Sequence, residues 1–217
     1  MMMDMPYRSG ERLSGLTGVI LAGGRNRRMG GSHKALLPFA NELLIHRQLR
    51  LMGQLCGETI LVTNEPRLFL PIVGRGVRMI ADYYAAKGPL GGIHAALSLA
   101  RHADVWIVAC GMPFISPHAA RLMLEEKKAG GGMAVIPFIG GKLHPLHGIY
   151  DRGAAEAVRL SIESGEKRVE SFLETIPYQR MEEEEFRNGG IDTSFVMNVN
   201  TPEDYERALR MIDSRTG

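Results

Sequence analysis

Short apolar runs that alternate with helical patterns limit the folds open to this chain more than any other feature. The runs are rich in β-branched residues, and they occupy residues 16–24, 58–64, 77–82, 104–110, 133–138, 144–150 and 195–200. The helical patterns occupy residues 41–57, 88–102, 116–132, 152–164, 168–176 and 201–212. Strands that alternate with helices predict βαβ units and a mostly parallel sheet covered on both faces. We therefore expect an α/β protein whose ligands bind outside the carboxyl ends of the strands.

Capping residues mark several of the expected helix ends. Ser116 and Thr201 are predicted N-caps, because their hydroxyls can accept hydrogen bonds from the first free backbone amides of a helix. Gly57 is predicted to end the helix at 41–57, since glycine is common just after a helix. The acidic run MEEEEF, residues 181–186, predicts a solvated edge or turn in preference to a surface that binds a partner.

Composition excludes several classes of protein. The 217 residues are enough for one domain with a sizeable core, and we expect residues 1–15 to be a flexible lead to a single domain at 16–217. A formal net charge of +2 gives no bulk attraction to nucleic acid. No apolar run approaches the ~20 residues that span a membrane. The two cysteines form no CxxC pair, which favours buried thiols in a reducing cytoplasm.

The loop after the first predicted strand carries the strongest functional signal. It reads LAGGRNRRMGGSHKALL, residues 21–37, so Gly23 and Gly24 follow the strand directly. Glycines let the backbone approach a ligand, and the basic side chains add positive charge: Arg25, Arg27, Arg28 and Lys34. The spacing fits neither a P-loop nor GxGxxG. The loop predicts a polyphosphate site, although its composition alone also fits a basic surface loop.

This loop resembles the signature of Rossmann-like nucleotidyltransferases, and it is most similar to that of the molybdenum cofactor guanylyltransferase family. Four further segments resemble the same family in the same order: GPLGGIHAAL (88–97), ACGMPFISP (109–117), GEKRVESFLE (165–174) and VNTPEDY (199–205). The resemblance runs from about Leu16 to about Leu209. It implies a three-layer Rossmann-like nucleotidyltransferase fold. It also implies an enzyme that transfers GMP from GTP to the phosphate of molybdopterin and releases pyrophosphate.

The same resemblance assigns expected roles to individual residues. Those expected to bind the nucleotide are Leu21, Ala22, Gly23, Gly24, Lys34, Asn64, Asp82 and Gly111. Arg25, Arg28 and Lys34 are expected to catalyse by positioning and by neutralising charge. His144, Arg168, Asn198 and Asn200 are expected to bind the second substrate. Related sugar-phosphate and cytidylyl enzymes usually read LAAG where this chain reads LAGG at residues 21–24, which favours GTP over CTP.

One expected residue is missing from the resemblance. The family implies Mg²⁺ held by the aspartate of a CDxP segment, and Gly111 stands at that position. Asp104 lies at the far end of the same predicted strand and cannot replace it. We expect Asp82 to end a neighbouring strand, and we nominate it as a metal ligand. Asn198 and Asn200 offer amide oxygens, which are weaker ligands for Mg²⁺, and a water can fill the space at Gly111.

Three hypotheses follow for the activity, and the first is the guanylyltransferase that the resemblance implies. A phosphate nucleophile is already anionic near neutral pH, so a guanylyltransferase needs no general base, and the sequence holds no persuasive Ser/His/Asp or Cys/His arrangement. The second hypothesis is a nucleotide-binding paralogue that has lost catalysis, and the third is a cytidylyl or sugar-phosphate nucleotidyltransferase. For the first we expect a cytoplasmic enzyme. Its partners would be the molybdenum cofactor and proteins that deliver or accept it, with no nucleic acid and no membrane.

Overall fold

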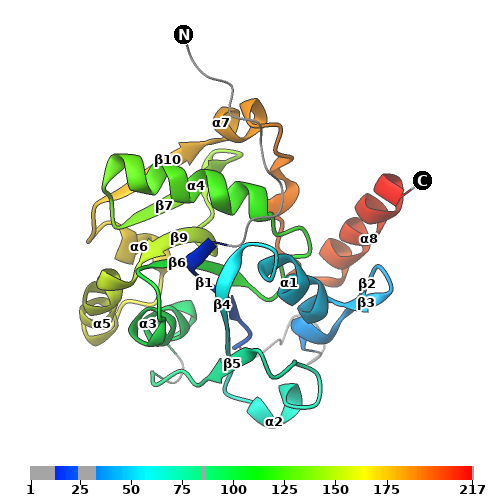
Figure 1. Ribbon diagram of the computed structural model, residues 1–217, viewed down its shortest axis with the longest axis horizontal. Coiled ribbons are helices and arrows are strands. Elements are labelled where there is room, and N and C mark those ends of the chain that lie inside the picture. The colour runs from blue at the N-terminus through cyan, green and yellow to red at the C-terminus, as the bar shows by residue number, and fades with distance from the viewer. Residues whose placement is uncertain (1–12, 24–32, 85–86, 217) are drawn as a thin grey trace.

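The computed structural model describes residues 13–23, 33–84 and 87–216, and it has the predicted α/β architecture (Figure 1). Strands β6, β1, β4 and β5 pair in parallel, β9 is antiparallel to β6 and β7, and β10 is parallel to β7. The sheet order is β10 (Tyr178–Glu182), β7 (Ala134–Ile139), β9 (His147–Asp151), β6 (Asp104–Ala109), β1 (Leu13–Leu21), β4 (Cys56–Val62) and β5 (Val77–Ile80), with β8 (Lys142–Leu143) paired to β7. The prediction of a mostly parallel sheet is therefore confirmed.

Helices cover both faces of this sheet. One face packs against α1 (Leu44–Met52), α2 (Pro66–Phe69), α4 (Pro117–Gly130) and α7 (Glu183–Asn188). The other packs against α3 (Pro89–Leu99), α5 (Ala155–Glu163) and α6 (Val169–Leu173). Trp106 and Ile107 are neighbours on β6 yet belong to opposite core clusters, because successive side chains of a strand point to opposite faces. A strand buried on both faces must be apolar throughout, as the run in β6 is.

A third, smaller cluster attaches the last helix to the hairpin that follows the predicted phosphate loop. Helix α8 (Pro202–Thr216) lies beside the hairpin of β2 (Pro38–Phe39) and β3 (Glu42–Leu43) at one side of the sheet (Figure 1). The Tyr205 hydroxyl donates a hydrogen bond to the Pro38 carbonyl. The buried members of the cluster are Phe39, Leu44, Phe114, Val199, Ala208 and Ile212. This packing holds the last helix against the hairpin and against Phe114, which follows β6.

The predicted N-caps are confirmed. The Ser116 hydroxyl accepts a hydrogen bond from the Ala119 amide at 3.1 Å, and α4 begins at the next residue. The Thr201 hydroxyl accepts one from the Asp204 amide at 3.2 Å at the start of α8. No helix within the described ranges is long and apolar enough to cross a membrane.

Two predicted element boundaries are wrong near the start of the chain. Helix α1 ends at Met52 with Gly53 as its C-cap, and Gly57 lies inside β4. Leu55 lies in the turn that precedes the strand, and Cys56 begins the strand, where it pairs with Leu13 of β1. The second wrong boundary is the start of β1. This strand begins at Leu13, within the stretch 1–15 that was expected to be a flexible lead, and residues 1–12 lie outside the described part of the chain.

One further prediction is wrong near the end of the chain, and one strand there was not predicted. Residues 195–200 form no strand. Residues 195 and 196 belong to the short helix η4 (Thr193–Val196), residues 197–200 are irregular, and the Val199 amide donates to the Gly111 carbonyl at 2.8 Å. The last strand is β10, whose mostly polar side chains gave no apolar signal at the sheet edge. The acidic run 181–186 is the end of β10 and the start of α7, where Glu182 and Glu185 form a reciprocal capping box.

A buried lysine binds two aspartates at the end of the sheet opposite the carboxyl ends of the parallel strands. Lys127 of α4 donates to Asp104 at 2.8 Å and to Asp151 at 3.0 Å, which confirms that Asp104 lies at the far end of β6 from Gly111. Burial works to lower the pKa of Lys127, but its hydrogen bonds to the two carboxylates outweigh burial and raise that pKa. Burial likewise works to raise the pKa of Asp151, and hydrogen bonds from the Gly153 amide and Lys127 outweigh it and lower that pKa.

We expect Lys127→Met to lower the free energy of unfolding by about 2 kcal/mol, because it leaves two carboxylates without their cation. Urea unfolding at neutral pH measures this loss. Because the pKa of Lys127 is raised, its contribution to stability is fully present below the ordinary lysine pKa. Because the pKa of Asp151 is lowered, its contribution is fully present above the ordinary aspartate pKa. The difference in the free energy of unfolding between the unmodified protein and the variant should therefore be constant between about pH 5 and 10 and shrink below about pH 4. Lys128→Met, at an exposed neighbouring position, is the control and should change little.

Candidate functional site

The carboxyl ends of four parallel strands stop level with one another and form the candidate site. Leu21, the last residue of β1, pairs with Val62 of β4 and with Ala109 of β6. Backbone hydrogen bonds carry the ladder one residue further, from the Ala22 amide to the Val62 carbonyl at 2.9 Å and from the Cys110 amide to the Leu21 carbonyl at 3.1 Å. The residues that follow these strands consequently share one edge: Ala22, Gly23, Asn64, Asp82 and Gly111. The structure thus places these five predicted nucleotide-binding residues along one edge of the sheet.

The predicted phosphate loop is only partly described. Gly24, Arg25, Arg27 and Arg28 lie outside the described residues, so their expected roles stay predictions. The described chain resumes at His33, whose ring nitrogen Nε2 lies 3.2 Å from a carboxylate oxygen of Glu65. Lys34 begins the short helix η2 (Lys34–Leu36), and its ammonium donates to the Asn200 side-chain oxygen at 2.7 Å. This contact joins residues 166 positions apart in the sequence.

Gly111 is enclosed by the segment that precedes α8. A Cβ atom at position 111 would lie 2.4 Å from Oδ1 of Asn198, 3.0 Å from the Val199 carbonyl oxygen and 3.3 Å from Cδ of Lys34. Oδ1 of Asn198 is buried and has no hydrogen-bond partner within the described part of the chain. Asn198, Asn200 and Lys34 therefore gather at the tip of β6, as the sequence predicts, and Asn198 fills the place of a side chain at 111.

Asp82 is anchored at another point of the same edge. Its amide donates to Oδ1 of Asn64 at 3.0 Å, and its carboxylate accepts from the Tyr84 amide at 2.7 Å. The carboxylate also lies against Gly91 of α3, where a Cβ would come within 2.4 Å of both oxygens. Burial raises the pKa of Asp82, with opposition from the Tyr84 amide and from His94. Asn64 and Asp82 are thus in direct contact at this edge, and their role in nucleotide binding stays a prediction.

The expectation that Asp82 ends a strand next to Gly111 is wrong. Strands β4 and β1 lie between β5 and β6 in the sheet. Three strand spacings of about 4.8 Å separate the two strand tips by roughly 14 Å. One magnesium ion, whose ligands lie about 2.1 Å away, cannot contact residues at both tips.

Three of the four residues predicted for the second substrate line a cleft of about 260 Å³ beside the β6 tip. His144 comes from the turn before β9, Arg168 from the start of α6, and Asn198 from the segment before α8. The Arg168 guanidinium donates to the Ser171 hydroxyl at 2.8 Å. Burial lowers the pKa of His144, which favours a neutral imidazole at pH 7. Asn200 does not line this cleft and contacts Lys34 instead.

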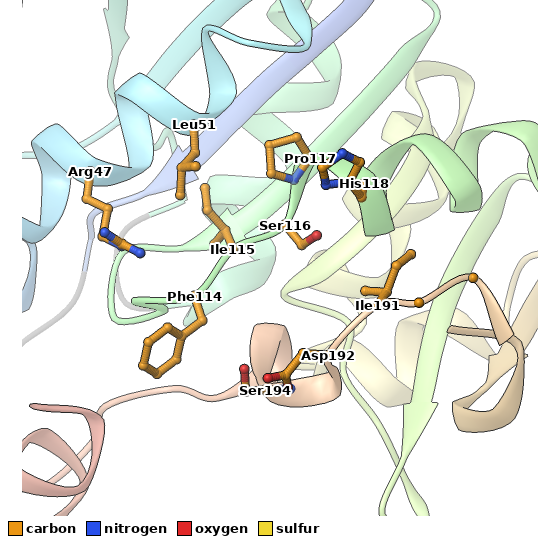
Figure 2. A pocket seen from close by; sticks show the side chains of 12 residues that line it. Arg47, Leu51, Phe114, Ile115, Ser116, Pro117, His118, Ile191, Asp192 and Ser194 are labelled. Atoms are coloured by element: carbon orange, nitrogen blue, oxygen red, sulfur yellow. The ribbon is translucent and has the colours of Figure 1, made fainter. Parts of the chain in front are cut away.

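A larger cleft of about 450 Å³ lies elsewhere, between α1, the start of α4 and residues 189–194 (Figure 2). Figure 2 shows Arg47, Phe114, Ser116 and Asp192 around it, together with apolar side chains. It contains none of the residues predicted for either substrate. We assign the smaller cleft, together with the strand edge, to the candidate site because the cleft includes Met112 and Asn198, which adjoin the β6 tip, whereas size alone would favour the larger cleft.

The residues at the β6 tip do not fit a magnesium ion held by the protein. Magnesium is usually held by one or two carboxylates together with substrate phosphates, and the side-chain oxygens next to Gly111 are amides. The Asp204 carboxylate is already bound to the Asn200 and Thr201 amides at 3.0 and 3.2 Å. Residues 24–32 include no aspartate or glutamate. No group of three or more His, Cys, Asp or Glu residues suited to a metal occurs in the described ranges.

His147 supports the loop after β6 from within the core, and the sequence patterns did not single it out for this role. Its Nε2 accepts a hydrogen bond from the Ser116 amide at 3.3 Å, and its ring packs against Trp106 and Phe195. Burial lowers the pKa of His147 to about 3. The imidazole is therefore neutral in the folded protein, and it holds the start of α4 in place.

We expect His147→Phe to reduce the loss of stability at mildly acid pH. The unfolded chain binds a proton near pH 6.5 and the folded chain only near pH 3, so the stability that His147 gives above pH 6.5 is lost as the pH falls toward 3. From pH 7.5 to 5.5 this costs about 1.4 kcal/mol in the unmodified protein. Urea unfolding at the two pH values measures it, and the exposed His118→Gln control should keep the full loss.

Comparisons with known proteins agree with the geometry. The family described as the MobA-like NTP transferase domain matches residues 18–182. A probable molybdenum cofactor guanylyltransferase of Pelotomaculum thermopropionicum is 39% identical over 203 residues, which are 93% of this chain and 96% of that protein. The molybdenum cofactor guanylyltransferase of Syntrophotalea carbinolica is 31% identical over 88% of this chain and 90% of its own length.

A solved structure is also similar along the whole fold. The molybdopterin-guanine dinucleotide biosynthesis protein A of Archaeoglobus fulgidus superposes with a TM-score of 0.77 and 26% identity. The match covers 91% of this chain and 99% of that one. Its overall arrangement therefore parallels the sheet and helices described above.

Proposed function

We propose, because this chain belongs to the MobA-like NTP transferase family, that it transfers GMP from GTP to the phosphate of the molybdenum cofactor and releases pyrophosphate. Membership of the family implies a nucleotide substrate and a divalent metal ion. One observation carries the proposal furthest. The strand edge with the predicted nucleotide residues and the cleft with the predicted second-substrate residues meet at Asn198, beside Gly111.

The strand edge is suited to hold a nucleotide. Gly23 is exposed at the end of β1, and a Cβ there would meet no atom of the described residues within 4 Å, so a ligand can approach the backbone closely. Lys34 places a positive charge at the β6 end of this edge. Asn64 and Asp82 stand at the other side, where an amide and a carboxylate can bind the hydroxyl or amino groups of a nucleoside.

The smaller cleft is suited to hold the second substrate. Lys167 and Arg168 line it and can bind a phosphate, with the planar guanidinium of Arg168 able to do so through two hydrogen bonds. Neutral His144 and the Asn198 amide offer groups that match the polar edge of a pterin. Leu143, Leu146 and Val196 supply apolar surface for a flat ring.

The transfer itself needs position and charge more than proton movement. An oxygen of the pterin phosphate forms a bond to the α-phosphorus of GTP, while the bond from that phosphorus to the bridging oxygen breaks and its electron pair leaves with pyrophosphate. The attacking oxygen is already anionic, so no base must remove a proton. Lys34 stabilises the negative charge that collects on the phosphates. We assign no step to the metal, because the described tip has no carboxylate that fits one.

The test is to incubate the protein with GTP, a divalent metal and the molybdenum cofactor. We expect pyrophosphate and a GMP-linked cofactor, measured by a coupled phosphate assay and by mass spectrometry. CTP, UTP and ATP serve as matched nucleotides and should give much less product. A folded protein that binds GTP and yields no pyrophosphate would favour the nucleotide-binding paralogue, for which Gly111 is the motivating observation. Turnover with CTP in place of GTP would favour a cytidylyl enzyme.

We expect Lys34→Met to weaken GTP binding about tenfold or more, because one close charge contact with a phosphate contributes at least about 1.4 kcal/mol. Isothermal titration calorimetry measures the affinity. Lys128→Met removes an equal charge from an exposed position on α4 and should leave it unchanged. An unaltered affinity in the Lys34 variant would contradict this role.

We expect Arg168→Ala to raise the KM for the molybdenum cofactor about tenfold and to leave the Kd for GTP unchanged, because Arg168 lines the cleft and lies away from the strand edge. Initial rates at varied cofactor concentration, with GTP in excess, separate KM from kcat. Arg210→Ala, at an exposed position on α8, is the matched control. A change confined to GTP affinity would place Arg168 with the nucleotide instead.

A further inference from the structure

A polar side chain interrupts the apolar face of α1. The buried residues of this helix are Leu44, Ile45, Gln48 and Met52, and Gln48 is the only polar residue among them. Its side chain is completely buried, and Ile45 and Met52 beside it belong to the core on this face of the sheet. Burying an amide costs free energy that an apolar side chain would not cost. The position of Gln48 therefore needs an explanation other than packing.

The amide of Gln48 holds the turn that ends β6. Its Nε2 donates to the Ala109 carbonyl and to the Met112 carbonyl, both at 2.9 Å. Because both partners are carbonyl oxygens, the nitrogen must face them, and both of its hydrogens are used. Oε1 of Gln48 is buried and has no hydrogen-bond partner within the described residues. Two hydrogen bonds and one unpaired oxygen roughly offset each other, so Gln48 fixes the shape of the turn more than it adds stability.

Gly111 lies in this turn, between the two residues whose carbonyls Gln48 holds. The preceding helix residue, Arg47, donates from Nε to the Pro113 carbonyl at 2.8 Å. From the other side, the Val199 amide donates to the Gly111 carbonyl at 2.8 Å. The β6 tip is therefore held by α1 and by the segment before α8 together.

Helix α1 is also joined to the short helix that begins with Lys34. The amide of Leu44, the first residue of α1, donates to the carbonyl of Leu37, the residue after η2, at 3.0 Å. Lys34 and Gln48 thus belong to one hydrogen-bonded piece of the chain, and Gln48 attaches that piece to the β6 tip. Met112, whose carbonyl Gln48 holds, lines the smaller cleft. The contact consequently relates the strand edge to the wall of that cleft.

We propose that Gln48 is a positioning residue for the transfer, because it holds the β6 turn where the nucleotide at the strand edge meets the second substrate in the smaller cleft. The proposal rests on the proposed function and concerns the same site. Gln48 is covered from solvent, so it acts through the turn and not by contact with a substrate. A displacement of about 1 Å can slow a reaction about a hundredfold. The groups proposed to bind the substrates lie elsewhere, at Asn64, Asp82 and Arg168, so the loss of Gln48 affects kcat and not binding.

Initial rates of the transfer, with each substrate varied in turn, test this role. Gln48→Met keeps the length of the side chain and removes both donors. We expect it to lower kcat about tenfold or more and to change each KM by less than about threefold. Unchanged kcat in this variant would overturn the proposal.

Thr17→Val is the matched control for these rates. Thr17 is equally buried, its hydroxyl donates to Glu58 at 2.8 Å, and it lies near the end of β1 that is opposite the site. We expect this variant to lower Tm, because a buried hydrogen bond is lost, and to keep kcat. An equal fall in kcat in both variants would show a general effect of lost stability and would overturn the role of Gln48.

Amide hydrogen exchange of the apo protein tests the turn without any substrate. In Gln48→Met we expect the Met112 and Val199 amides to exchange about tenfold faster relative to amides in the middle of β1, because the turn then opens locally. In Thr17→Val this ratio should not change. An equal acceleration of all amides, or an unfolded Gln48→Met variant, would mean that Gln48 only stabilises the fold, against the proposal. Absence of transfer by the unmodified protein overturns the proposed function instead, and exchange at the turn still decides whether Gln48 holds it.

Discussion

The level ending of the parallel strands is the constraint on which the rest of this site depends. The pairing of Leu21 with both Val62 and Ala109 fixes where β1, β4 and β6 stop. Their apolar side chains are buried on both faces, so a slip in register would move each core residue away from its place. The polar groups that follow these parallel strands are consequently delivered to the same edge, where residues distant in the sequence lie along one line.

A second contact completes the edge from a distance. The segment before α8 is irregular, yet the bond between the Val199 amide and the Gly111 carbonyl carries Asn198 and Asn200 to the β6 tip. The packing of α8 on the hairpin at 38–43 holds this segment in place. The Lys34–Asn200 hydrogen bond then joins the start of the fold to its end, so the strand edge and the smaller cleft are parts of one surface.

The sequence predicted most of the fold because its signals were local. Strong apolar runs and capping residues such as Ser116 identified the central strands and α4. The failures occurred where tertiary contacts overrode a local pattern. The apolar run at 195–200 lacks a partner strand, and the polar strand β10 exists because β7 offers it an edge to pair with. A strand that forms because a neighbouring strand pairs with it carries almost no signal in its own sequence.

The sequence by itself determined the class of fold, the family of the chain and the set of residues that follow the strands, because periodicity and ordered motifs are written along the chain. Only the tertiary structure decided which of those residues meet. It placed β4 and β1 between Asp82 and Gly111, and it brought Asn198 beside Gly111. The physical reason is that strand order and contacts between side chains depend on packing between distant segments, which no local pattern encodes.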